Sequence, residues 1–300
     1  MHSYWDDFWA LRGYKDAVAI AEALGRRSDA RRLARQRDEF RRELYASLDA
    51  ATRQHGIDYL PGAAELGDFD PTSTTIGLTP GGEQQRMPRV LLENTYRRYW
   101  EFFTARRAGS KPWEDYTPYE LRNVSAFVRL GWRDRAHELL DYFYADQRPR
   151  AWNQWAEVVG REPRKPRFLG DMPHGWISSD FMRAALDAFA YEREPEHALL
   201  LAEGIPPAWL DGDGIAIRGL RTPYGPLGYR LRRTGSELAL DVDAGMAIPP
   251  GGIVLRWPFA GRPATARLNG RRVPLTDGAV TIRKLPATLT IQLPDEALTQ

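Results

Sequence analysis

The stretch YWDDFWALRGYKDAVAIAEALG, residues 4–25, decides the fold class of this chain. Its apolar residues between positions 5 and 24 cover nearly the whole circumference of a helix, and Gly25 supplies a stop signal. A helix that is apolar on every side is normally buried on every side. The pattern therefore predicts that residues 5–24 form an inner helix, enclosed by other helices.

The helical segments that follow alternate between two kinds of pattern. From Ser28 to Gln54 one narrow apolar stripe lies among Arg and Glu residues, which predicts a helix with one face in water. Further helices are predicted at 88–107, 117–130, 133–146 and 175–192, and the last is again apolar on most sides. Buried and half-buried helices in turn are what a toroid of helical hairpins requires, with one ring inside the other.

After Pro195 the pattern changes to short alternating runs, such as GIAIRGL, ELALDV and ATLTIQL, separated by Gly, Pro and Asn turns. Such runs predict an antiparallel β-sandwich. A chain of 300 residues is long enough for two domains, each with its own core. We therefore expect a helical domain over residues 1–193 and a β-sandwich over residues 194–300.

The composition limits the function. With 42 Lys+Arg against 40 Asp+Glu the net charge is +2, which weighs against nucleic acid and acidic membranes as partners. The absence of cysteine excludes disulfides, thiolate metal sites and Cys nucleophiles. No P-loop, dinucleotide fingerprint, HExxH or GxSxG motif is present, so no cofactor is expected. Without a signal-like or membrane-length apolar segment the sequence as written predicts a cytoplasmic protein, or a periplasmic or secreted one if its N-terminus is truncated.

Acids and tryptophans gather in the loops that precede the buried helices, and in a toroid these loops open at one mouth. Asp6 and Asp7 lie in the first, and Asp68 and Asp70 in the second. The later loops contribute Trp113, Glu120, Trp152, Trp155, Glu157, Asp171, His174, Trp176 and Asp180. Hydrolysis of a glycosidic bond needs one protonated and one ionised carboxyl group on opposite sides of the sugar. Exposed indole rings are natural partners for the flat C–H faces of sugars.

Several of these residues also have structural interpretations. Asp6 is also typical of a residue that caps its helix, where the dipole lowers a carboxyl pKa, and taken alone the acid pair favours a cap over a catalyst. Glu157 lies in a stretch without helical periodicity, which favours a functional role. Asp180 falls within an apolar helix, so it either has a buried partner such as Arg183 or His174 or lines the cavity. His174 has no second His at ligand spacing, so we expect a positioning hydrogen bond and no metal.

Three stretches resemble motifs of the six-hairpin glycosidases, the glucoamylase-like and rhamnosidase-like enzymes. YWDDFWALRGYKDAVAIAEALG is similar to the segment in which a W-E-E pair opens an inner helix, one member being the general acid. MPHGWISSDFM, residues 172–182, resembles the P-x-x-W-x-x-A-E-[FY] motif, whose Glu is the general base and matches Asp180. WNQWAEVVG, residues 152–160, resembles the preceding loop, whose acid matches Glu157. Asp stands for Glu at two matched positions, which shortens the reach of both carboxyl groups.

The resemblance implies a partial (α/α)6 toroid with an appended β-sandwich. A full toroid of this family has twelve helices, and the pattern here supplies about half of them. The resemblance therefore implies the C-terminal portion of a larger catalytic module, whose open face associates with a missing N-terminal half of the barrel or with a second copy.

The predicted function is inverting hydrolysis of an oligo- or polysaccharide, with Asp6 or Asp7 as acid and Glu157 or Asp180 as base. Sugar-stacking roles are expected for the indoles and hydroxyl-binding roles for three polar residues: Trp5, Trp113, Trp155 and Trp176, and Glu120, Asp171 and His174. Two alternatives remain open. One is a polysaccharide lyase that pairs His174 with Tyr116 or Asn123, and the other is a non-catalytic carbohydrate-binding or scaffold fragment.

Overall fold

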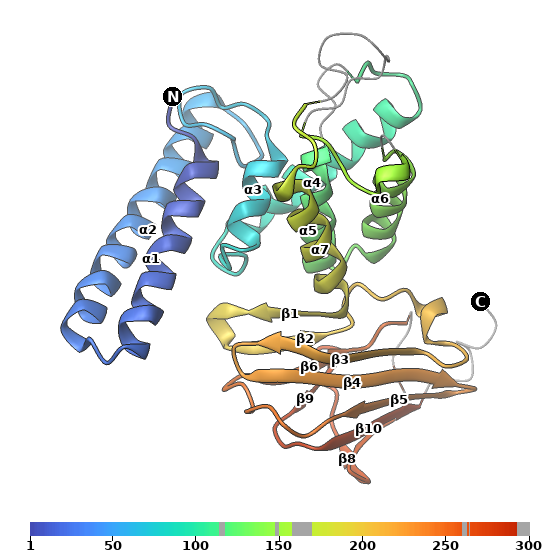
Figure 1. Ribbon diagram of the computed structural model, residues 1–300. Helices are drawn as coiled ribbons and strands as arrows, with labels where there is room; N and C mark the ends of the chain where they lie inside the picture. Colours follow the sequence, from blue (N-terminus) through green and yellow to red (C-terminus); the bar gives the residue numbers. More distant parts are fainter. Residues whose placement is uncertain (114–117, 148–149, 158–169, 260–262, 264, 293–300) are drawn as a thin grey trace. The chain divides into compact units, whose positions relative to one another are not determined.

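The computed structural model describes residues 1–113, 118–147, 150–157, 170–259, 263 and 265–292. The chain divides into two compact units (Figure 1). The helical unit comprises Met1–Leu130 and Arg135–Ala184, and the β unit comprises Gly131–Asp134 and Ala185–Gln300. The contacts thus divide the chain after Ala184, whereas the sequence pattern placed the change near residue 193. Among the described residues, none of the helices combines the length and the apolar character needed to cross a lipid bilayer.

The predicted helices are present, with two differences. The helices are α1 (Tyr4–Ala23), α2 (Arg27–His55), α3 (Pro71–Leu78), α4 (Arg89–Arg107), α5 (Arg122–Arg129), α6 (Arg133–Ala145) and α7 (Gly175–Phe189), with 3-10 turns at Pro118–Leu121 and Arg150–Trp152. Helix α3 lies in a stretch that the sequence pattern treated as a loop. Helix α7 ends at Phe189, so the helix predicted to reach residue 192 is wrong at its end, where the chain enters a strand.

Helix α1 is not enclosed on every side, and that expectation is wrong. It packs against α2 and α3 through a face spaced at three and four residues, which includes Tyr4, Phe8 and Leu11. The opposite face leaves Trp9 40% and Ile20 59% exposed. Apolar coverage of the circumference makes burial possible, but only neighbouring helices can supply it.

The alternation of enclosed and half-exposed helices holds for the segments from α2 to α6. Helix α3 is buried along nearly its whole length and packs against α1, α4 and α5, and α5 is buried from Arg122 to Val128. Helices α2, α4 and α6 each bury one stripe and expose the rest. Asp70 begins α3 as its N-cap, because its carboxylate accepts the backbone N–H groups of Thr72 and Ser73. The predicted toroid stays a prediction.

A buried carboxylate joins α1 and α2 to the segment after α3. The Glu83 side chain is fully buried, and its carboxylate lies 2.5 Å from Lys15 Nζ of α1. Arg41 of α2 donates to both carboxylate oxygens at 3.0 Å, and the Tyr45 hydroxyl donates at 3.3 Å. Lys15 also donates to the Gly81 carbonyl at 2.6 Å. Burial is tolerated here because each charge meets an opposite charge or a hydrogen-bond partner.

The β unit consists of two sheets (Figure 1). The four-stranded sheet has the order β1 (Ala190–Arg193), β2 (Ala198–Leu201), β6 (Gly252–Arg256) and β9 (Ala279–Ile282). The six-stranded sheet has the order β3 (Ile215–Thr222), β4 (Gly225–Thr234), β5 (Glu237–Val242), β10 (Ala287–Gln292), β7 (Thr265–Leu268) and β8 (Arg271–Val273). All neighbours are antiparallel except β2 and β6, so the wholly antiparallel sandwich is corrected at this one pair.

The two sheets share one hydrophobic core. Leu199 and Leu201 of β2 lie in the same cluster of buried side chains as Leu238 and Leu240 of β5 and Leu289 of β10. Alternate residues of β5 and β10 face this core, as expected of a sandwich, while β2 and β6 in the middle of the other sheet are buried along all or nearly all of their length.

Candidate functional site

The two tryptophan-bearing stretches meet in the helical unit. Trp5 lies in the first turn of α1 and Trp176 in the first turn of α7, and their ring centres are 5.6 Å apart with the planes tilted by 50°. Trp9 contacts the edge of Trp5 at 6.0 Å. The Trp176 side chain remains 58% exposed. The start of α1 at Tyr4 therefore lies beside the start of α7 at Gly175, although the two are 171 positions apart in the sequence.

A tyrosine links Trp176 to the later loop residues. The Tyr119 hydroxyl lies 2.7 Å from Nε2 of His174 and donates to Oε1 of Glu157 at 3.5 Å. The rings of Tyr119 and His174 each contact Trp176, with centres 6.5 and 6.3 Å apart. Burial, followed by the nearby Glu157 charge, raises the pKa of Tyr119 to about 12, so the phenol is neutral at physiological pH.

Asp180 has a partner that the sequence pattern did not identify. Nε and Nη2 of Arg122, at the start of α5, donate to Oδ2 of Asp180 at 3.1 and 2.8 Å. The Arg122 guanidinium also lies 4.7 Å from the centre of the Tyr119 ring. Burial raises the pKa of Asp180, although Arg122 and, more weakly, Arg183 and His174 oppose this shift. We refer to Trp5, Tyr119, Arg122, Glu157, His174, Trp176 and Asp180 as the aromatic–acidic cluster.

The paired acids Asp6 and Asp7 directly follow Trp5 of this cluster, and both lie in the first turn of α1. The N-cap of α1 is Ser3, so Asp6 does not cap the helix. Asp6 is exposed and Asp7 is half-buried, and burial together with the Asp6 charge raises the pKa of Asp7 against a smaller opposing effect of His2. In the described part of the chain neither acid hydrogen-bonds to Glu157 or Asp180.

Three predicted substrate-binding residues have packing partners elsewhere in the helical unit. Trp113 stacks on Tyr142 with centres 5.2 Å apart. The Glu120 carboxylate is buried and accepts from Arg106 at 3.0 and 2.7 Å. Trp155 is 4% exposed and donates through Nε1 to the Phe143 carbonyl at 3.1 Å. These contacts do not support sugar binding by Trp113, Glu120 or Trp155.

Tyr119 and Arg122 are the cluster residues that the sequence pattern missed. Both lie in the stretch TPYELRN, residues 117–123, in which Glu120 was the predicted substrate-binding residue. Their spacing of three residues at the start of a buried helix is the signal that could have identified them, because it places two polar side chains on one helix face. Of the two residues proposed as lyase partners of His174, Tyr116 lies outside the described residues. Asn123 is buried and accepts from the Thr75 hydroxyl at 2.7 Å.

Three residues of the site could hold a cation. Glu157, half-buried His174 and exposed Asp171 each place one ligand atom within 4.8 Å of the others. The backbone N–H of Glu157 donates to the Asp171 carbonyl at 3.0 Å, which holds these two positions together. The prediction of no metal rested on the lack of a second histidine at ligand spacing from His174. In the structure the carboxylates of Glu157 and Asp171 lie close enough to His174 to serve as ligands with it.

No model of a protein family and no curated protein matches the chain. Among solved structures, the chain is similar to an α-L-rhamnosidase from Dictyoglumus thermophilum, with 12% sequence identity and a TM-score of 0.43. The match covers 93% of this chain and 31% of that chain, so this chain spans about a third of the length of the rhamnosidase. A likeness at this level does not establish a shared fold.

Proposed function

We propose that the helical unit is a glycoside hydrolase that cleaves an oligo- or polysaccharide by inverting acid/base chemistry. The observation that carries this proposal is the contact of Trp5 with Trp176, which brings together two helix starts that each bear carboxyl groups. Asp6 and Asp7 follow Trp5 on α1, and Asp180 follows Trp176 by one turn on α7. Partly exposed indoles beside carboxyl groups match the needs of a sugar-cleaving site.

The carboxyl groups differ in ways that suit different roles. A raised pKa keeps the proton on Asp7 to a higher pH than on an ordinary carboxyl, as a general acid requires, and Asp6 is its alternative. The base is Glu157 or Asp180. Burial raises the pKa of Asp180 as well, but its pairing with Arg122 opposes this shift and favours the ionised form that a base requires. Inversion requires about 6.5–9.5 Å between acid and base, so that a water molecule fits between the base and the sugar.

Substrate contacts follow from the same cluster. Trp5 and Trp176 would stack on a sugar ring through their exposed faces, and His174 and Asp171 would bond its hydroxyl groups. His174 is held by Tyr119, which fixes the orientation of its ring.

The test is hydrolysis of a panel of oligosaccharides by the full chain, with the anomer of the first product recorded by NMR. We expect the inverted anomer, and a loss of about 10²-fold or more in kcat for Asp7→Asn and for either Glu157→Gln or Asp180→Asn. Asp16→Asn, on the same helix as Asp7 and paired with Arg12 at the surface, is the matched control and should retain full activity. A retained anomer would exclude the inverting mechanism. Glycan binding without turnover, unchanged in Asp7→Asn and Glu157→Gln, would instead indicate a non-catalytic carbohydrate-binding protein.

A polysaccharide lyase is the second candidate, because Tyr119, His174 and Arg122 form the kind of set that proton abstraction beside a uronate needs. The hydroxyl and Nε2 are 2.7 Å apart, and Arg122 supplies a positive charge next to the ring. The pKa of about 12 weighs against it, since a phenol that holds its proton so firmly is a poor base at neutral pH. Unsaturated uronate products, detected by ultraviolet absorbance, would favour the lyase and exclude hydrolysis.

A further inference from the structure

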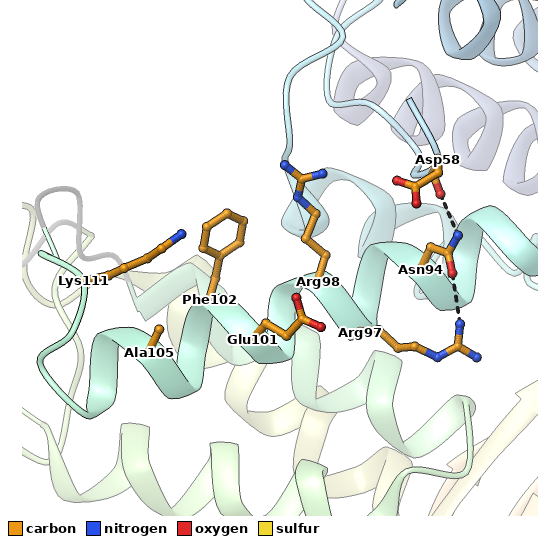
Figure 2. Close-up of a pocket in the computed structure, with 8 residues that line it drawn as sticks. All are labelled: Asp58, Asn94, Arg97, Arg98, Glu101, Phe102, Ala105 and Lys111. Atoms are coloured by element: carbon orange, nitrogen blue, oxygen red, sulfur yellow. Dashed lines mark hydrogen bonds between the residues drawn. The ribbon is translucent and has the colours of Figure 1, made fainter. Parts of the chain in front are cut away.

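The outer face of α4 carries a groove of about 620 Å³ that is separate from the aromatic–acidic cluster (Figure 2). It is lined by residues of α4, of the loop before α3 and of the segment after α4: Asp58, Asn94, Arg97, Arg98, Glu101, Phe102, Ala105 and Lys111. Figure 2 shows the Phe102 ring between the side chains of Lys111 and Arg98.

The polar groups at one end of the groove already have partners within the protein. Nδ2 of Asn94 donates to the Asp58 carbonyl at 3.0 Å, and Oδ1 of Asn94 accepts from Arg97 at 3.0 Å (Figure 2). Arg97 also donates to Glu93 at 2.6 Å. This end is therefore satisfied without a ligand.

The cations at the other end contact rings and no carboxylate. The Arg98 guanidinium lies 4.6 Å from the ring centre of Tyr59, 5.1 Å from that of Phe69 and 5.8 Å from that of Phe102. Lys111 Nζ lies 3.9 Å from the Phe102 ring centre. Among the described residues neither cation has an ion-pair partner, although Glu101 lies one turn from Arg98 on the same helix.

This arrangement leaves the N–H donors of Arg98 available in a fixed orientation. Three ring contacts hold the guanidinium away from the ion pair that the spacing to Glu101 permits, and cation–π contacts engage its face rather than its donors. Neighbouring arginines of the same unit, such as Arg89 and Arg97, do form such pairs with Glu93. A planar fork with free donors matches the geometry of a carboxylate.

We propose that this groove is a binding site for an acidic saccharide, a sugar chain that carries carboxylate groups. Arg98 and Lys111 would hold the carboxylate, Phe102 would contact the C–H face of the ring, and Glu101 would accept hydrogen bonds from hydroxyl groups. The choice of a saccharide among carboxylate ligands rests on the proposed function. Three cations, of which Arg97 is paired with Glu93, beside two acids do not give the dense positive charge that a nucleic acid requires.

The test is calorimetric titration of the full chain with trigalacturonate, galacturonate monomer and neutral maltotriose as probes. We expect saturable binding of trigalacturonate, weaker binding of the monomer and none of maltotriose at this site. Arg98→Gln and Lys111→Gln should each weaken trigalacturonate binding about tenfold, since each removes a charge-assisted contact. Arg89→Gln, on the same helix but outside the groove and paired with Glu93, is the matched control and should change the affinity less than twofold.

Three results would overturn the proposal: no saturable binding, equal binding of maltotriose, or equal weakening by Arg89→Gln and Arg98→Gln. The Lys111 substitution keeps the test valid if Arg98→Gln disturbs the ring contacts, because Lys111 lies in an exposed segment after α4. The same titrations with Asp7→Asn separate this site from the proposed catalytic one. That substitution should leave trigalacturonate binding unchanged, whether or not the chain hydrolyses any substrate.

Discussion

Replacing Glu83 by glutamine should weaken the helical unit, because it removes the negative charge that two buried cations share. Breaking a buried ion pair by removing one partner typically costs about 3–5 kcal/mol. The two cations do not suffer equally. The Lys15 side chain is 7% exposed and would lose the Glu83 carboxylate 2.5 Å from its Nζ, while it keeps the Gly81 carbonyl. Arg41 is 16% exposed and retains Asp38 at 3.0 Å, so its charge is not stranded.

We therefore expect the lower end of the range, about 3 kcal/mol, with most of the loss arising from Lys15. For a unit of this size that corresponds to a fall in Tm of roughly 6–12 °C. Urea unfolding followed by far-ultraviolet circular dichroism measures the effect in the helical unit, which contains most of the helices. Glu39→Gln is the matched control. Its carboxylate on α2 is 62% exposed and 3.8 Å from Arg42, so its loss should cost under about 0.5 kcal/mol.

A second substitution tests the assignment to Lys15. Lys15→Met in the Glu83→Gln background removes the buried ammonium that has lost the Glu83 charge, and it should recover part of the lost stability. If Glu83→Gln unfolds at the same urea concentration as Glu39→Gln, the argument from burial is refuted.

Two further outcomes follow from other residues. Burial, followed by the Asp6 charge, raises the pKa of Asp7. The stability linked to this group is therefore complete below the ordinary pKa of an aspartate, and it is lost as the pH rises through the folded-state pKa. Asp7→Asn should therefore raise Tm relative to the unsubstituted chain at pH ~7 and have less effect at pH ~3, and an equal effect at both values would contradict the shift. Gly251→Ala should destabilise the β unit by about 1–3 kcal/mol, because a Cβ there would lie 2.2 Å from the Glu196 carbonyl oxygen. Gly13→Ala, which meets open space on α1, should not destabilise in the same thermal assay.

The helices with one apolar stripe could be predicted from the sequence because their pattern reports directly which face is buried. Helices α2 and α4 follow this rule. The pattern of α1 states only that any face could be buried, and whether Trp9 is covered depends on which helices surround it. The end of α7 depends on residues outside the helix, because Ala190 and Tyr191 pair with Leu201 and Leu200 of β2. Strand pairing there overrides a helical sequence pattern.

The candidate site shows the same division. Trp5, Trp176 and His174 could be predicted because rare residue types beside acids are informative by themselves. Tyr119 and Arg122 were missed, because their spacing shows only that they share a helix face, and their importance arises from contacts with segments more than thirty positions away. Glu120 and Trp155 are the converse case: each has a chemically suitable side chain, but a nearby packing partner already occupies it.

The position of β10 has a consequence for how the chain is made. Among the ten strands of the described residues this one comes last in sequence, yet it lies inside the six-stranded sheet and pairs with β5 on one side and β7 on the other. During synthesis on the ribosome, β3, β4 and β5 can therefore pair as successive hairpins, while the slot beside β5 stays empty until Ala287–Gln292 has emerged. Until then the Leu238 and Leu240 side chains are not covered by Leu289. The exposed core side chains and the unpaired edge of β5 can then bind chaperones or the same segment of a neighbouring polypeptide.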